Sequence, residues 1–249
     1  MSKIDLYKGD CLEVMDELIA EGIVVDAIIT DPPYGTTACK WDSVIPFPEM
    51  WTRLNKLIKP NGAIVLFGSE PFSSALRMSN IEDYKYDWYW NKTKPVGFLN
   101  AKKMPLKDIE TLSVFYENLP TYNPQGTIKV DKVNNNSNKV KKHNNISVQN
   151  GGALKTSHYK QDTSNYPRQI LKYSIENGLH PTQKPVALME YLIKTYTNEG
   201  ELVLDFTMGS GTTGVACKNL CRDFIGIELN DEYFEIANKR LEAVQGSLF

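Results

Sequence analysis

A glycine-rich segment near the carboxyl end of the chain has the residue types of a nucleotide-binding loop. Residues 209–214, GSGTTG, follow the apolar run ELVLDF and lead into a stretch with helical spacing. Glu228 ends the next apolar run, 19 residues after Gly209. Glycines in such a loop let the backbone approach a ligand, and an acid at this distance accepts hydrogen bonds from ribose hydroxyls. The spacing favours a nucleotide-like ligand over a turn that only packs.

A second cluster, Asp31-Pro32-Pro33-Tyr34, follows the apolar run IVVDAIIT at residues 23–30. This run predicts a buried strand, so the cluster is expected at its carboxyl end, where open α/β sheets bind ligands. The cluster combines a carboxylate, a backbone carbonyl held by rigid prolines, and an aromatic ring. Taken alone, the same residues could form a turn with a packed aromatic side chain.

The position of the glycine loop distinguishes two classes of nucleotide-binding protein. Only 21 residues follow Glu228, which is too few to complete a parallel sheet. The missing strands must therefore come from the part of the chain that precedes the loop. A nicotinamide-binding domain would usually continue after its first loop, whereas a permuted methyltransferase has the order seen here.

Together these motifs resemble the beta-type amino-methyltransferases of DNA, which modify N6 of adenine or N4 of cytosine. The resemblance rests on DPPYG at residues 31–35, DFTMGSGTTG at 205–214 and HPTQKP at 180–185, and extends over about residues 4–116 and 180–240. It implies an α/β fold, namely a permuted Rossmann-like sheet with helices on both faces. It also implies S-adenosylmethionine (SAM) as cofactor and double-stranded DNA as partner.

The resemblance gives a catalytic role to the cluster Asp31, Pro32, Pro33 and Tyr34. An exocyclic amine is a poor nucleophile because its lone pair is delocalised into the base. The Asp31 carboxylate and the Pro32 carbonyl can each accept one amine hydrogen, which directs the lone pair toward the methyl group. Tyr34 offers a face on which an everted base can stack. Positioning is then the main contribution, and it can supply about 7–11 kcal/mol of the barrier.

Further residues are expected to bind SAM because they match family positions. Asp205 and Phe206 would lie beside the methionine part and the adenine, and Glu228 on the ribose. This chain has Phe206-Thr207-Met208 where the family often has Pro-Phe. The departure bears on the expected cofactor contact of Phe206 and not on the glycine loop. The segment 180–184 would frame the methionine carboxylate, or alternatively only begin a helix. The full expected set is Asp10, Cys11, Asp31, His180, Thr182, Lys184, Asp205, Phe206, Gly209, Ser210, Gly211, Thr212 and Glu228.

Two segments beside the first cluster, residues 36–44 and 91–103, carry basic and aromatic side chains. These side chains could contact phosphates or occupy the space that an everted base leaves. With two lysines from the middle of the chain, the expected DNA-binding set is Lys40, Trp41, Lys92, Lys94, Lys102, Lys141 and Lys142.

Apolar periodicity predicts the elements that must position these residues. It indicates a helix over residues 47–58 and strands at 63–68, 86–90 and 112–116, then a helix after residue 185. The two motifs can form one site only if the strands ending at Thr30 and Phe206 lie side by side.

Between residues 118 and 178 the periodicity fades, and Asn, Lys, Ser and Gly dominate. This span holds nine lysines and arginines against three acids, a net charge of +6 in a chain of net charge −2. A basic lobe fits contact with a polyanion, although a solvated loop is the alternative. We therefore expect a catalytic domain from residues 1–117 and 179–249, and a target-recognition insertion from residues 118–178.

Composition excludes several classes of protein. The chain is 41% hydrophobic and 23% charged, as in ordinary globular proteins, and it has no apolar run long enough to cross a bilayer. No secretory signal is apparent, so a cytoplasmic protein is expected. The cysteines and histidines have no ligand spacing, which argues against a metal. The oligomeric state is left open, a homodimer included.

The target base and two other interpretations complete the expectations. Cytosine enzymes more often have serine in place of Asp31, so N6 of adenine is the expected target and N4 of cytosine the alternative. A nicotinamide-dependent dehydrogenase would share the glycine loop without needing the Asp31 cluster. A DNA-binding module without catalytic activity would bind duplex DNA and transfer nothing.

Overall fold

The computed structural model describes residues 2–35, 42–135, 158–176 and 183–244. The chain forms two compact units, Met1–Asn123 with Arg168–Phe249, and Pro124–Pro167. The sequence predicts an insertion over residues 118–178, whereas the first unit extends to Asn123 and resumes at Arg168. In the described parts of the chain, no helix has the length and apolar character needed to cross a bilayer.

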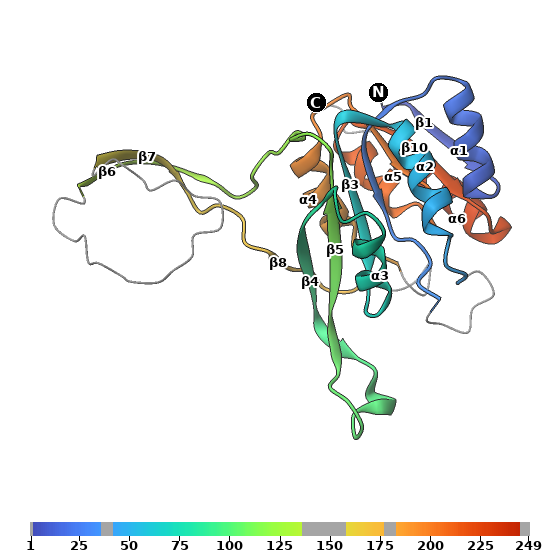
Figure 1. The fold of residues 1–249 in the computed structure, drawn as a ribbon, viewed down its shortest axis with the longest axis horizontal. Helices are drawn as coiled ribbons and strands as arrows, with labels where there is room; N and C mark the ends of the chain where they lie inside the picture. The colour runs from blue at the N-terminus through green and yellow to red at the C-terminus, as the bar shows by residue number, and fades with distance from the viewer. Residues whose placement is uncertain (1, 36–41, 136–157, 177–182, 245–249) are drawn as a thin grey trace. The chain divides into compact units, whose positions relative to one another are not determined.

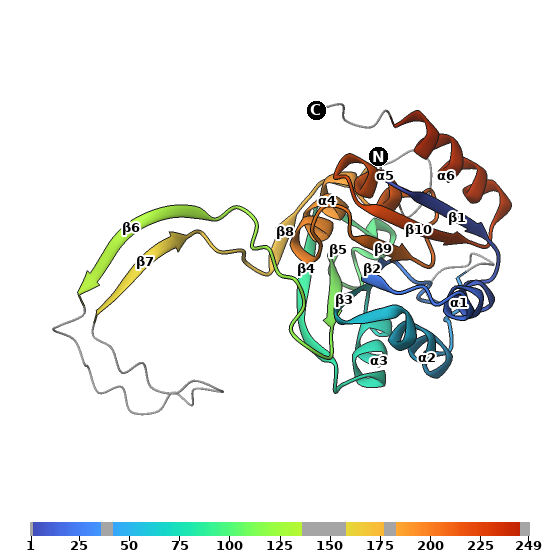
Figure 2. The same ribbon diagram turned by 90° about the horizontal axis from the view of Figure 1, so that it is seen from above.

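The first unit contains an eight-stranded sheet with the order β1-β10-β9-β2-β3-β5-β4-β8 (Figures 1 and 2). Only β5 runs antiparallel to its neighbours, β3 and β4. β1 pairs with β10 from the other end of the chain, which is the permuted order that the sequence predicted. The strands are β1 (Ile4–Lys8), β2 (Val25–Thr30), β3 (Ile58–Gly68), β4 (Tyr84–Val96), β5 (Lys107–Phe115), β8 (Ile170–Lys172), β9 (Leu202–Asp205) and β10 (Asp223–Glu228).

Helices cover both faces of this sheet. Side chains alternate along a strand, so Ala27 and Ile29 of β2 contact one core cluster while Ile28 contacts the other. A strand buried on both faces needs the continuous apolar run that residues 23–30 provide. One cluster is covered by α1 (Cys11–Ala20), α2 (Phe47–Leu57) and α3 (Phe72–Ser79), and the other by α4 (Val186–Tyr196), α5 (Thr212–Asn219) and α6 (Asp231–Ala243).

The adjacent strands β2 and β9 direct the chain to opposite faces. Their register pairs Ala27 with Val203 and Ile28 with Leu204. After β9 the chain enters α5 on one face, whereas after β2 it continues to α2 on the other. Such a divergence opens a crevice at the carboxyl ends of the two strands. The two strand tips lie side by side, as the sequence predicted.

Several features of the sheet differ from the sequence expectation. β3, β4 and β5 are longer than the predicted strands at 63–68, 86–90 and 112–116, and β3 begins at Ile58, which was expected to end the preceding helix. The short helix η1 (Phe98–Asn100) lies between β4 and β5. β8 was not predicted, because three residues are too few to show a period-2 pattern.

The second unit contains an antiparallel pair of strands, β6 (Ile128–Asn135) and β7 (His158–Ser164). The pair begins with Ile128 opposite Ser164. Just outside it, the Asn165 side-chain amide donates to the Gly126 carbonyl at 2.6 Å, which holds the two chain segments together at this end.

Candidate active site

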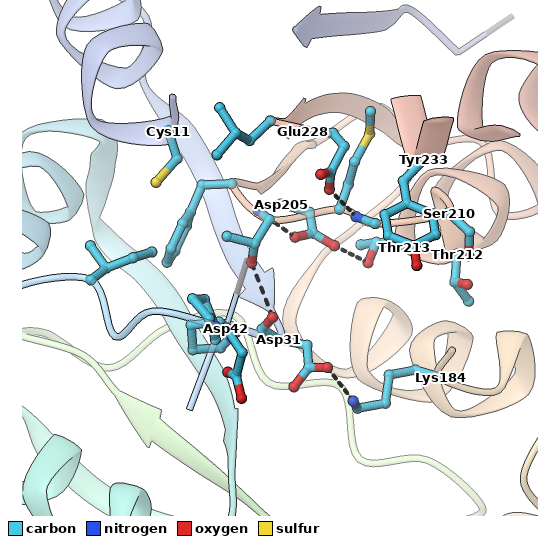
Figure 3. Close-up of a pocket in the computed structure, with 18 of the residues that line it drawn as sticks. Cys11, Asp31, Asp42, Lys184, Asp205, Ser210, Thr212, Thr213, Glu228 and Tyr233 are labelled. Atoms are coloured by element: carbon cyan, nitrogen blue, oxygen red, sulfur yellow. Dashed lines mark hydrogen bonds and ion pairs between the residues drawn. The ribbon is translucent and has the colours of Figure 1, made fainter. Parts of the chain in front are cut away.

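A cavity of about 350 Å³ opens at the crevice between the tips of β2 and β9 (Figure 3). This volume lies in the range of ligand sites in proteins, roughly 300–1,000 Å³. Its wall includes Asp31-Pro32-Pro33-Tyr34 from the first motif and Gly209 with Ser210 from the second. Further parts of the wall come from the β1–α1 turn, from Asp42, Ser43 and Ile45, from the segment before α4 and from the β10–α6 turn. The fold therefore joins the two motifs in one site.

The glycines of the loop between β9 and α5 serve different purposes. Gly209 lines the cavity, and its N–H donates to Glu228 Oε2 at 2.9 Å. Gly211 has a φ of 75°, and a Cβ there would lie 3.0 Å from the Cβ of Ala237 on α6. Gly211 was expected to bind cofactor, but it is not among the residues that line the cavity. The position requires glycine because the positive φ strains any side chain and because α5 begins close to α6.

Asp205 holds the tips of β2 and β9 together. Its carboxylate accepts hydrogen bonds from the Thr30 hydroxyl at 2.5 Å, from the Thr213 hydroxyl, and from the Thr207 N–H at 3.2 Å. Burial raises the pKa of Asp205 to about 6, although these hydrogen bonds act in the opposite direction. Because Thr30 is the last residue of β2, this network fixes the backbone position of Asp31, the next residue.

Glu228 presents its carboxylate to the cavity from the end of β10. One oxygen accepts the Gly209 N–H, and the other accepts the Asn230 N–H at 2.8 Å. Burial raises the pKa of Glu228 above its ordinary value, against the effect of these hydrogen bonds. Each carboxylate oxygen still has acceptor capacity, so Glu228 can accept from ligand hydroxyls without losing its orientation.

Asp31 lies directly after β2 with its carboxylate in the cavity wall. Its two oxygens accept hydrogen bonds from the Tyr34 hydroxyl and the Lys184 ammonium, and Figure 3 shows Lys184 reaching it from the segment before α4. The Asp31 carbonyl accepts the Thr207 hydroxyl at 3.1 Å. Burial raises the pKa of Asp31, and Lys184 opposes this rise. The Tyr34 ring packs against Phe72, with centroids 5.0 Å apart.

Behind Asp31, buried charges alternate in sign. Lys184 Nζ lies 3.7 Å from Glu110 Oε2, and Glu110 Oε1 pairs with Lys92. Burial alone would raise the pKa of Glu110, but Lys184 and Lys92 outweigh it and hold the pKa below its ordinary value. Burial alone would lower the pKa of Lys184, but Asp31 and Glu110 outweigh it and raise the pKa. Lys184 is therefore an ammonium ion between two carboxylates.

Comparison with known proteins places this geometry in a family. A family model described as DNA methylase, N6_N4_Mtase, matches residues 25–239. The chain belongs to this family. The match removes the nicotinamide-dependent dehydrogenase as an alternative, since it covers the Asp31 cluster and the glycine loop together.

Relatives and solved structures agree with this assignment of the methylase. The Type II methyltransferase M2.DpnII of Streptococcus pneumoniae is 29% identical over 97% of this chain and 91% of its own length. The Type II methyltransferase M.HpaI of Haemophilus parainfluenzae is 30% identical over 88% of this chain and 68% of its own. The crystal structure of an M1.HpyAVI–SAM complex has a TM-score of 0.68 and 31% identity, covering 96% of this chain and 99% of that one.

Most of the residues expected to bind the cofactor of the methylase line the cavity. Asp10 does so while its side chain caps α1, accepting the Leu12 N–H at 2.8 Å. Burial raises the pKa of the neighbouring Cys11 thiol to about 12, so Cys11 contributes an apolar wall and not a nucleophile. His180 and Thr182 lie outside the described residues. The expected residues in the wall are Asp10, Cys11, Asp31, Lys184, Asp205, Phe206, Gly209, Ser210, Thr212 and Glu228.

The structure corrects one expected DNA contact of the methylase. Lys92 is largely buried, is ion-paired with Glu110, and lies 5.3 Å from the centroid of the Trp90 ring. It cannot contact a phosphate without leaving this buried carboxylate. Lys94 and Lys102 are exposed. The other expected contacts lie outside the described residues: Lys40, Trp41, Lys141 and Lys142.

Several residues that shape the site were missed by the sequence analysis. Arg240 of α6 donates to the Ser210 carbonyl at 3.1 Å and to the Thr212 hydroxyl at 2.8 Å, which fixes the glycine loop. Asp42 accepts the Gly35 N–H at 2.8 Å and so fixes the backbone directly after Tyr34. Arg240 belongs to no motif, because the packing of α6 against the loop brings it to the site. Glu110 was missed for a similar reason, because contacts between distant segments bring it to the site.

Proposed function

We propose that this methylase transfers a methyl group from SAM to N6 of adenine at a specific site in double-stranded DNA. The observation that carries the proposal is one cavity in which the Asp31 carboxylate meets the glycine loop. Two relatives are named Type II methyltransferases, and a similar solved structure is named as a SAM complex. Adenine is favoured over cytosine because an aspartate, not a serine, occupies position 31.

The residues of the cavity fit SAM as the cofactor. Glu228 retains acceptor capacity for ribose hydroxyls, and Phe206 and Leu229 provide apolar wall for a purine. Gly209 lets the backbone border the ligand closely. Bound SAM supplies a methyl group on a positively charged sulfonium, and the Asp205 carboxylate in this wall would stabilise that charge.

Asp31 and Pro32 would prepare the amine of the base. Each accepts one amine hydrogen, through the Asp31 carboxylate and the Pro32 carbonyl. Both Asp31 oxygens already accept a hydrogen bond, from Tyr34 and from Lys184, so the amine takes a remaining lone pair or displaces one of these donors. The Tyr34 ring, fixed by Phe72, then supports the everted base.

We assign recognition of the DNA sequence to the second unit, Pro124–Pro167. This unit carries seven lysines and two acids, a net charge of +5. A positive lobe brings a protein to the phosphate backbone, while a few side chains read the bases.

Product identification tests the proposed function. The protein is incubated with unmethylated phage DNA and methyl-labelled SAM, and the DNA is then digested to nucleosides. We expect label on N6 of deoxyadenosine, at one short sequence once the modified positions are mapped. Label only on N4 of deoxycytidine would reassign the target base. DNA binding without any label would instead identify a module without catalytic activity.

The substitution Glu228→Gln tests the ribose contact. Hydrogen bonds to charged groups contribute about 1.5–3 kcal/mol, so the Kd for SAM should rise about 10- to 100-fold. The measurement is equilibrium binding of SAM, with the melting temperature as a check that the Gly209 contact survives. Glu235→Gln, at an exposed position of α6, is the matched control and should bind SAM normally. Unchanged affinity in Glu228→Gln would remove this residue from the cofactor site.

A further inference from the structure

The hairpin formed by β4 and β5 has a basic surface at its far end. From residue 94 to residue 107 the chain carries four lysines and no acid. The four are exposed: Lys94, Lys102, Lys103 and Lys107. An acid-free run of exposed lysines on an otherwise acidic chain favours a polyanionic partner.

The tip between these lysines exposes large apolar side chains. Leu99 is 101% exposed and Phe98 is 68% exposed, with Met104 beside them at 50%. The tip is nevertheless a defined turn, because the Asn100 N–H donates to the Gly97 carbonyl at 2.9 Å and the Lys103 N–H donates to the Asn100 carbonyl at 2.8 Å. Apolar side chains that an ordered turn holds in solvent do not stabilise the fold, so they indicate contact with a partner.

The strand register places this tip on the cavity side of the sheet. Gly68, the last residue of β3, pairs with Thr111 of β5, and Thr111 pairs with Tyr89 of β4. The rest of the hairpin therefore extends beyond the edge at which Asp31 lies, and Figure 1 shows it continuing past the end of β3. From Glu110 to Lys107 alone the strand advances about 10 Å.

The base of the hairpin is connected to the candidate catalytic aspartate. Glu110 of β5 and Lys92 of β4 form an ion pair, and Glu110 lies 3.7 Å from the Lys184 ammonium that contacts Asp31. These contacts hold the start of the hairpin close to Asp31. A hairpin that starts beside Asp31 and extends past the mouth of the cavity can contact the DNA duplex from which the target nucleobase has been everted.

We propose that Phe98 and Leu99 enter the base stack of double-stranded DNA as an apolar wedge, in the space vacated by the everted base. This rests on the proposed function, since only a base-everting enzyme creates that space. Eversion breaks stacking contacts, and an inserted apolar side chain replaces part of them. Lys102 and Lys103 next to the wedge contact the phosphates. A second copy of the chain is a poorer partner, because a symmetric contact would bring two acid-free lysine surfaces together.

Rescue by a modified substrate tests the wedge. Methyl-transfer rates are measured on a duplex that carries the mapped site, and on the same duplex with an abasic position opposite the target base. The double substitution Phe98→Ala with Leu99→Ala should slow transfer about 10- to 100-fold on the first duplex, in line with the cost of unstacking one step. On the second duplex, where eversion is easier, it should come within about 3-fold of the wild type.

Two further variants separate the wedge from general DNA binding. Lys102→Ala with Lys103→Ala should weaken binding to both duplexes alike and reduce the slope of log K against log salt by about two, one for each phosphate contact. Ile81 is an exposed apolar residue just before the start of β4, at the end away from the hairpin tip. The control variant Ile81→Ala should behave as wild type. SAM affinity and melting temperature should not change in the wedge variant, because both side chains are exposed.

An equal loss on both duplexes, or no loss on either, would overturn the wedge. A change in oligomeric state caused by the double substitution would assign the tip to a second copy instead. The wild type is measured in the same series. If it transfers no methyl group to the matched duplex, the proposed function fails and the wedge fails with it, whereas failure of the wedge alone leaves wild-type transfer intact.

Discussion

The substitution Asp31→Ala should abolish methyl transfer while SAM affinity stays within a few fold of the wild type. The carboxylate is one of the two acceptors that hold the amine, and alanine offers none. Loss of one preorganised electrostatic group costs about 10²–10³ in rate, and we expect the upper value because only the Pro32 carbonyl of the proposed pair then accepts from the amine. The cofactor contacts proposed for Glu228 and the glycine loop do not depend on Asp31.

Single-turnover transfer at saturating SAM measures this effect, because it separates the chemical step from binding and product release. Equilibrium binding of SAM is measured on the same preparations. Glu82→Ala provides a matched control: this acid is exposed in the turn before β4, at the opposite edge of the sheet. A variant that retains near wild-type transfer would show that Asp31 is not catalytic. A variant that loses SAM binding as well would assign Asp31 to the cofactor.

The structure explains why Asp31 is sensitive to small displacements. Its carbonyl is held by Thr207 from the loop after β9, and the residue before it, Thr30, is held by Asp205. Both contacts cross the crevice between the two halves of the permuted sheet. The residues proposed to bind the target base and those proposed to bind the cofactor are thus joined by one network of hydrogen bonds. A shift of either strand tip would move the amine relative to the methyl donor.

The sequence predicted the parts of this site that are local in the chain. The run at 23–30 predicted β2, and the spacing of Gly209 and Glu228 predicted a β-loop-α-β unit, because each depends on neighbouring residues alone. The permuted order could also be predicted, because the glycine loop follows the Asp31 cluster late in the chain, as in the family that the motifs resemble. From these elements it follows that the two motifs meet at one edge.

The charges behind Asp31 could not be predicted in the same way. Lys92, Glu110 and Lys184 come from β4, β5 and the segment before α4, and their contacts depend on the register between these strands. Lys92 looks like any surface lysine in the sequence, and it was expected to contact DNA. Only the pairing of β4 with β5 shows that it neutralises Glu110. The boundaries of the second unit also depend on contacts, because β8 joins the main sheet although its surroundings have insertion-like composition.

Lys184→Met should slow methyl transfer at least about 10-fold near neutral pH, the equivalent of one pKa unit, and shift the acidic limb of the pH–rate profile to higher pH. Asp31 must be ionised to accept the amine hydrogen, so activity rises as pH passes through the pKa of Asp31. Burial already raises this pKa, and Lys184 is the main group that lowers it. Without the ammonium the pKa of Asp31 rises further. A larger fraction of the carboxyl group is then protonated at any pH on the limb, and raising the pH should recover activity.

The pH–rate profile distinguishes this role from a merely structural one. Removing one partner of a buried ion pair costs about 3–5 kcal/mol, so the melting temperature of Lys184→Met should also fall, and rates must be measured well below it. Lys184→Arg keeps the charge and should hold the limb near its wild-type position, while Lys194→Met, at an exposed position of α4, should change neither rate nor profile. A lower rate with an unshifted limb would mean that Lys184 only supports the fold or the cofactor. A shifted limb in Lys184→Met, together with an unshifted limb in Lys184→Arg, would show that the charge of Lys184 acts on the ionisation of Asp31. A nearby positive charge favours the ionised carboxylate and so lowers the pH at which the group loses its proton.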